Sequence, residues 1–431
     1  MRLLKRALFT SSCWSLVDEG VRPYWVPAVA NSRRVGQGFE QAKRITCRGS
    51  SISLLSDLKY RATMSRKFSA SVLAAIILWP LPAWQDLARG SAPDTQGADV
   101  EALIRSGHWK RARSILEPQV KAHPQDPRDC YLLAEVKMSF KDFDGALPLA
   151  QHAVDLDIKN SDYHLKLGRV FGEMAARASF FLAGSLAVKF RKEVEIAIQL
   201  DPTNLDALNS LMQFKFQAPD LMGGNKDEAR ALAEKIKLLN PSEGYLAYAK
   251  LAELEKNPAE VEADFLKAVQ ANPKNYGALT AVAKFYSQPP HAKYDEATKH
   301  AQYALLLDPK QIGAHWILAR VYALQERWSD LEQILATAEK NIPDDLRPFY
   351  EAAQALMEVG KDFPRAEGYA KKYLSQEPEG EEPDYAEAHR LLGLLFEREG
   401  RKAEARAEIQ TALRLRPNFK AAKDDLKRWG N

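Results

Sequence analysis

The sequence predicts an all-α protein built as a solenoid of antiparallel helix pairs. With 431 residues, the chain is longer than one hydrophobic core usually sustains, so it contains either several domains or an array that grows by repetition. Prolines and helix-type patterns recur about every 34 residues, a spacing that favours the array. Hydrophobic residues make up 46% and charged residues 27%, which is typical of a water-soluble helical protein.

Two segments show the repeated pattern most clearly. The first runs from Ala386 to Pro417, and the second runs from Ile312 to Pro343. Each has a bulky residue, a Leu followed by a small residue, an aromatic residue, spaced apolar residues and a closing proline. The matching positions are His389, Leu392, Gly393, Phe396, Ala405, Ile409 and Ala412 in the first, and His315, Leu318, Ala319, Tyr322, Leu331, Leu335 and Ala338 in the second.

This pattern resembles that of the tetratricopeptide repeat family, and the resemblance covers residues 98–429. It implies a right-handed superhelix of about eight helix pairs, closed by a capping helix from Phe419 to Trp429. Members of the family mostly bind peptides or proteins in the concave groove of the superhelix. The fold does not by itself specify the ligand.

The residue types have physical reasons. Small residues such as Gly168, Ala319 and Gly393 are expected where the two helices of one pair cross, because they let the backbones approach closely. The Asp-Pro and Asn-Pro pairs are expected to end the second helix, since the residue before a proline avoids the α-helical region.

The first 97 residues do not show the repeat. Residues 64–83 have a basic start, a short apolar core and two prolines, which is typical of a secretory signal peptide. We therefore expect residues 1–63 to be a mis-called or disordered extension before a true start at Met64, and residues 84–97 to be a linker. The mature protein is expected to be periplasmic or secreted. Alternatively, residues 68–83 stay as a membrane anchor, the only membrane contact that we expect.

Charge and chemistry exclude several function classes. Residues 1–67 hold 13 Lys and Arg against 4 Asp and Glu; because the whole chain carries +4, the remaining residues carry −5 and offer no basic stripe for nucleic acid. The eight histidines and three cysteines show no metal-ligand spacing, and no cofactor motif is present. No catalytic motif appears, and we expect no enzyme activity. The loop acids Glu377, Glu379, Glu381, Glu382 and Asp384 are interpreted as a solvated run.

Two adjacent repeats carry extra residues, at 174–190 and 218–226. The first insert contains Phe180 and Phe181 between basic residues, and it either lengthens the core helices or offers a partner or membrane surface. The second contains Gly223, Gly224 and Lys226 before a helix. It is either a structural turn or, less favoured, a loop that binds an anion at the helix N-terminus.

The leading hypothesis is a non-enzymatic scaffold that binds a protein or peptide in its concave groove. The phase of the repeat predicts eight groove residues, namely Tyr131, Glu135, Arg169, Asn209, Gln213, Trp316, Arg320 and Arg390. Among them, Tyr131 and Trp316 are expected to be the anchors, with nearby arginines. One alternative is an assembly subunit of an envelope complex that docks through the 174–190 insert. A distant alternative is an enzyme of unrecognised type.

Overall fold

A computed structural model describes residues 95–380 and 383–430. The predicted N-terminal extension, the signal-type segment and nearly all of the linker lie outside the described residues. The side chains of Phe180 and Phe181 also lie outside this description, although both residues belong to a helix.

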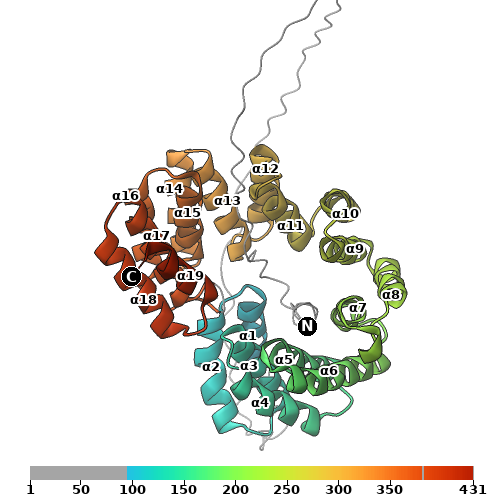
Figure 1. Cartoon of the computed structure of the whole chain (residues 1–431). Coiled ribbons are helices and arrows are strands. Elements are labelled where there is room, and N and C mark those ends of the chain that lie inside the picture. Colours follow the sequence, from blue (N-terminus) through green and yellow to red (C-terminus); the bar gives the residue numbers. More distant parts are fainter. Residues whose placement is uncertain (1–94, 381–382, 431) are drawn as a thin grey trace, which may run out of the picture. The chain divides into compact units, whose positions relative to one another are not determined.

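Nineteen α-helices make up the described part of the chain, in the order that Figure 1 follows from blue to red. They are α1 (Thr95–Arg105), α2 (Trp109–Ala122), α3 (Pro127–Ser139), α4 (Phe143–Leu156), α5 (Ser161–Arg177), α6 (Phe180–Leu200), α7 (Leu205–Gln217), α8 (Lys226–Leu239), α9 (Pro241–Glu255), α10 (Pro258–Ala271), α11 (Tyr276–Ser287), α12 (Tyr294–Leu307), α13 (Ile312–Leu324), α14 (Trp328–Asn341), α15 (Arg347–Val359), α16 (Phe363–Tyr373), α17 (Tyr385–Arg398), α18 (Lys402–Leu415) and α19 (Lys420–Trp429).

The helices form consecutive hairpins, and the second helix of a hairpin usually packs on the first helix of the next. The all-α fold of stacked helix pairs is thus confirmed. The number of repeats needs a correction: α1 to α18 make nine hairpins, whereas the sequence indicated about eight.

The predicted crossing points are confirmed. A β-carbon added at Gly393 would lie 3.0 Å from Ile409 Cδ1 and 3.1 Å from the carbonyl oxygen of Ala405, both on the second helix of the same hairpin. Gly168 meets Val194 on α6 in the same way. In these two hairpins the glycine therefore sets how closely the two helices approach.

The Asx-Pro pairs end helices as expected, and one of them also begins the next helix. Asn240 terminates α8, and its side chain accepts hydrogen bonds from the backbone N–H groups of Ser242 and Glu243 at the start of α9. Pro241 then occupies the first position of α9, where a missing N–H costs nothing. Because Asn240 is both the C-cap of α8 and the N-cap of α9, no further residue separates the two helices.

The two inserts have different structures. The first lengthens α5 and α6 to 17 and 21 residues, and it buries Ala183, Leu186 and Ala187. The second forms a short 3-10 helix, η2 (Asp220–Met222), followed by Gly223 at a φ of +92°. Of the open interpretations, lengthened core helices describe most of the first insert.

The core is a chain of apolar clusters that runs from hairpin to hairpin. The largest extends from α11 to α18, and a second extends from α3 to α7. The capping helix α19 covers the last hairpin with Ala422, Leu426 and Trp429. Within the described residues, no helix combines the length and apolarity that crossing a membrane requires.

Candidate binding surface

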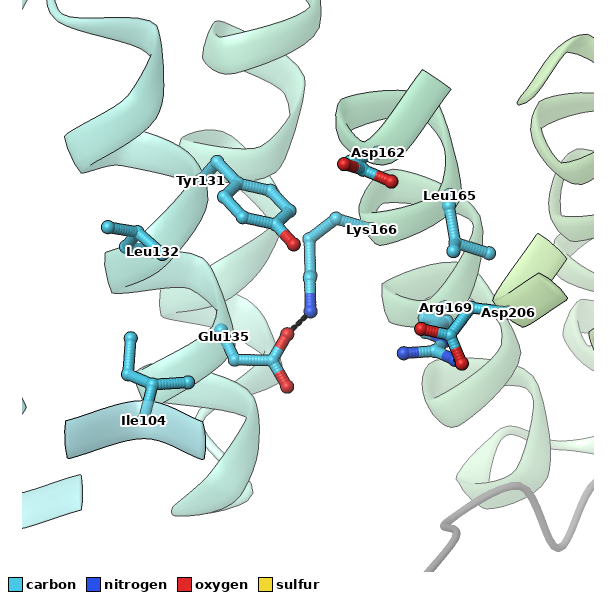
Figure 2. Close-up of a pocket in the computed structure, with 9 residues that line it drawn as sticks. All are labelled: Ile104, Tyr131, Leu132, Glu135, Asp162, Leu165, Lys166, Arg169 and Asp206. Carbon is cyan, nitrogen blue, oxygen red and sulfur yellow. Dashed lines mark ion pairs between the residues drawn. The ribbon is translucent and has the colours of Figure 1, made fainter. Parts of the chain in front are cut away.

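A pocket of about 190 Å³ opens between the first helices of the first four hairpins. Figure 2 shows its walls: α3 contributes one side, α5 the other, and α1 and α7 one residue each. The lining residues are Ile104, Tyr131, Leu132, Glu135, Asp162, Leu165, Lys166, Arg169 and Asp206. Three of the predicted groove residues, Tyr131, Glu135 and Arg169, are thus brought together.

The pocket is lined by paired charges. Lys166 reaches from α5 to form an ion pair with Glu135 on α3, as Figure 2 shows, and its Nζ lies 5.2 Å from the centre of the Tyr131 ring. Arg169 lies 3.4 Å from the Asp206 carboxylate of α7. Since these pairs join α3, α5 and α7, they fix the positions of polar groups across neighbouring hairpins.

Burial controls the chemistry of these groups. Lys166 is only 3% exposed, and this burial lowers the pKa of its ammonium group; the Arg169 cation lowers that pKa further, while Asp206 opposes both effects. Burial also raises the pKa of Tyr131 to about 12, so its hydroxyl stays protonated at neutral pH. The pocket therefore offers a neutral phenol, a buried lysine, an arginine and carboxylates on a fixed frame.

A second charged cluster includes Trp316 and Arg320 on α13. Both residues are buried, at 7% and 4% exposure. Arg320 pairs with Glu351 and Glu358 on α15, and Lys284 Nζ on α11 lies 5.9 Å from the Trp316 ring centre. Burial raises the pKa of Glu351, although three neighbouring cations oppose the shift. This cluster spans the three successive first helices α11, α13 and α15.

The other three predicted groove residues lie elsewhere. Gln213 on α7 donates to the side chain of Asn209 at 3.3 Å, and neither residue lines the pocket. Arg390 on α17 donates from Nε to Asp425 of the capping helix at 2.6 Å. The Arg390 charge thus contributes to the attachment of α19.

The glycine-containing loop before α8 uses its backbone donors internally. The N–H groups of Gly223, Gly224 and Asn225 donate to Asp220, Pro219 and Lys215 carbonyl oxygens. The Asn225 side chain caps the first turn of α8, and Lys226 Nζ lies 4.9 Å from the Phe216 ring centre. These contacts favour the structural turn over an anion-binding loop.

Part of the loop-acid interpretation was wrong. The side chain of Glu379 is fully buried and accepts a hydrogen bond from the backbone N–H of Lys110, 2.7 Å away. Glu377 pairs with Arg113, and Asp384 caps α17. Glu381 and Glu382 lie outside the described residues. Glu377 and Glu379 are paired because the first hairpin lies against them, which a local charge pattern does not reveal.

Sequence reasoning also missed Lys166, Asp206 and Ile104. Lys166 stands three residues before Arg169, so it shares that face of α5, and this spacing was an available signal. Asp206 and Ile104 come from other hairpins, which no sequence spacing indicates. Among the described residues, no group of His, Cys, Asp and Glu side chains is arranged to hold a metal ion.

Comparison with known proteins agrees with this architecture. The family model for the tetratricopeptide repeat matches residues 350–418. None of the curated proteins matches the sequence. Residues 350–418 thus have the tetratricopeptide repeat pattern, and the other described hairpins have the same helix-pair form.

Three solved structures are similar to parts of the chain. A thermophilic tetratricopeptide repeat protein of Thermus thermophilus is 19% identical, with a TM-score of 0.39, over 45% of this chain and 97% of its own. A tetratricopeptide repeat protein of Parabacteroides merdae is 18% identical, with a TM-score of 0.41, over 60% and 97%. Yeast Tom70 is 14% identical, with a TM-score of 0.42, over 76% and 79%.

Proposed function

We propose that the protein is a non-enzymatic scaffold that binds a protein or peptide on the first helices of its hairpins. The observation that carries this proposal is the pocket between α1, α3, α5 and α7, where charged and aromatic groups are already held in place. Preorganised side chains lose little freedom on binding, so more of the contact energy remains as affinity.

A peptide segment suits this pocket better than a single charged molecule does. Three carboxylates and two cations line it, and the pairs Lys166–Glu135 and Arg169–Asp206 already neutralise each other. Carboxylate oxygens have further lone pairs for main-chain N–H groups. Tyr131 adds an aromatic surface for one side chain of the peptide. The Trp316 cluster provides a second anchor further along the array.

The proposal is tested with a random peptide library selected on the full chain. Selected peptides are then measured by calorimetry against Tyr131→Ala, Lys166→Ala and Trp316→Ala. Loss of an anchor is expected to cost about 2 kcal/mol, or about thirtyfold in affinity. Lys340→Ala, an exposed position on the second helix α14, is the control. Selected peptides that bind all four variants like the wild type would remove both clusters from the proposal.

We further propose that the scaffold is exported by the segment at residues 64–83. This proposal rests on the basic start and the short apolar core of that segment. The alternative, an anchor formed by residues 68–83, is distinguished by the intact mass of the protein expressed from its native locus. A mature start near Trp84 in the periplasmic or secreted fraction supports export. A cytoplasmic chain that begins at Met1 rejects it.

A second candidate function is docking to an envelope complex through the 174–190 insert. It is favoured by three exposed apolar side chains, Leu182 and Val188 on α6 and Leu221 in η2. The side chain of Leu221 is 99% exposed. The variant Leu182→Ser with Leu221→Ser should then release the complex while Tyr131→Ala does not. Co-purification from native membranes measures both. Retention by the serine variant rejects this candidate.

A further inference from the structure

The first hairpin contacts two loops near the other end of the array. On one side lies the basic turn, by which we mean the N-cap His108 and the first residues of α2, with Lys110, Arg111 and Arg113. On the other side lie the acidic loops: Asp344 between α14 and α15, and Glu377 and Glu379 between α16 and α17. The contacting residues are between 233 and 269 positions apart in the chain.

Every member of the basic turn has an acidic partner. Arg111 donates to Asp344 at 2.7 Å, and His108 Nδ1 lies 3.2 Å from the other oxygen of that carboxylate. Lys110 Nζ lies 3.3 Å from Glu379, and Arg113 donates to Glu377 at 2.8 Å. Two backbone groups join in: the Lys110 N–H donates to Glu379, and the Glu377 carbonyl accepts from Lys110 Nζ at 2.6 Å.

The contact is close as well as charged. A β-carbon on Gly380 would lie 3.0 Å from the Trp109 ring, and Gly380 has a φ of +85°, which favours glycine. The side chains of Glu379 and His108 are 0% and 6% exposed. Across this contact, however, the start of α2 meets two loops, and no pair of helices packs along its length in the described residues.

This contact is held mainly by attraction between opposite charges. Its positive groups lie on one side and its negative groups on the other, so salt weakens the attraction between the sides. It lacks the broad apolar surface that holds neighbouring hairpins together. We propose that the basic turn and the acidic loops form an electrostatic latch, which joins the first hairpin reversibly to the last repeats and opens when its charges are screened.

Protonation of Glu379 supports a pH-sensitive latch. Burial raises the pKa of Glu379 to about 7; Asp344 and Asp345 add to this shift, while the Lys110 N–H and ammonium oppose it. A raised pKa for an acid means that the closed state binds the proton more tightly. The contribution of Glu379 to closure is thus fully present below its ordinary pKa of 4.5 and is lost as the pH rises through about 7.

Two other acids at this contact have different responses. Burial raises the pKa of Asp345, while Arg347 and the Lys110 charge across the contact oppose that shift. The pKa of Asp344 is lowered: burial acts upward, but the hydrogen bond and charge of His108 and the charge of Arg111 outweigh it. Asp344 therefore supports closure until the pH falls below 3.8, the ordinary pKa of its carboxyl group. Between pH 8 and pH 6 the balance favours closure, by about tenfold from Glu379 alone.

The latch is connected to the pocket through α1. This helix ends at Arg105, directly before the basic turn, and its Ile104 lines the pocket. Opening the latch frees the turn that follows α1, so the pocket wall gains freedom to move. This consequence for ligand binding rests on the proposed function, whereas the closure itself does not.

The test measures the distance between the two sides of the latch in the full chain. Ser114 on α2 and Ser375 after α16 are exposed, so spin labels are attached to cysteines at these positions in a background with Cys13, Cys47 and Cys130 replaced by alanine. Double electron–electron resonance at pH 6 and low salt should give one short distance. A longer population should grow in 1 M salt and at pH 8.

Charge reversal makes the test specific. Arg111→Glu with Arg113→Glu should produce the long distance, and adding Asp344→Arg with Glu377→Arg should restore the short one. Lys121→Glu, on the same helix but exposed and away from the loops, should change nothing. Far-UV circular dichroism checks that each variant keeps its helices.

Glu379→Gln tests the acid response separately. The amide resembles the protonated acid, so this variant should stay closed at pH 8 and lose most of the change between pH 6 and pH 8. An unchanged short distance in the charge-reversed variant and in 1 M salt overturns the latch. A full pH response in Glu379→Gln overturns the role of Glu379. Neither result depends on peptide binding, so failure of the latch would not reject the proposed function.

Discussion

Gly244 shows how closely the helices of this array approach each other. It lies on α9, and a β-carbon at this position would stand 2.1 Å from Lys237 Cα on α8, which is closer than two such atoms can lie. Backbone rather than a flexible side chain blocks the space, so α8 and α9 must separate to accept any larger residue.

We therefore predict that Gly244→Ala lowers the free energy of unfolding by about 1–3 kcal/mol. Gly368→Ala is the matched control, because Gly368 lies within α16 and no atom stands within 4 Å of its added β-carbon. That substitution should raise stability by about 0.5–1 kcal/mol, since alanine favours the helix. Urea unfolding followed by circular dichroism measures both. Equal effects of the two changes would contradict the close packing at Gly244.

Individual side chains mark the limit of what the sequence could predict. Tyr131, Glu135 and Arg169 were placed on one surface by the phase of the repeat, and they do line one pocket. The buried state of Glu379 was not predictable, because its partner Lys110 lies 269 residues away. Repeat spacing describes neighbours within a hairpin and between adjacent hairpins, and it contains no information about contacts between distant ones.

Among the elements, the helix ends are fixed by short polar side chains. Asn and Asp residues cap many of the helices, and Asn240 serves two of them at once. The position of these residues before prolines was visible in the sequence. The lengthened α5 and α6 were visible as an insert, but only their burial showed that most of the extra residues join the core.

Asn240→Ala should lower stability by about 1 kcal/mol, because the alanine cannot accept from the first N–H groups of α9. Ser179→Ala is the comparison: Ser179 precedes α6 and is exposed, but its side chain makes no capping hydrogen bond. That change should stay within a few tenths of a kcal/mol. Thermal unfolding distinguishes the two. A larger loss for Ser179→Ala than for Asn240→Ala would contradict this assignment of caps.

At the scale of the whole molecule, each hairpin leaves apolar surface for its neighbour, and an array needs an end that is polar outside. The helix α19 supplies that end over Ile409 and Ala412 of the last hairpin, and Arg390 attaches it through Asp425. The repeat pattern predicted this helix, because a polar-faced segment followed the last closing proline.

Deletion of residues 420–431 should expose this apolar surface and cause self-association. Light scattering after size exclusion is expected to show oligomers for the deleted chain and an unchanged mass for Lys423→Ser, which alters an exposed residue of α19. If the deleted chain has the same oligomeric state as the full chain at the same concentration, α19 has no capping role.

Photo-crosslinking from the pocket tests the central claim, that partners bind on the first helices, most directly. A benzophenone amino acid replaces Ile104 in one full-length chain and exposed Lys340 in another, each expressed from the native locus. We predict a covalent adduct with one protein from position 104, its loss when Tyr131→Ala and Lys166→Ala are added, and no such adduct from position 340. An adduct from position 104 that survives both substitutions, or none at all, would contradict the claim.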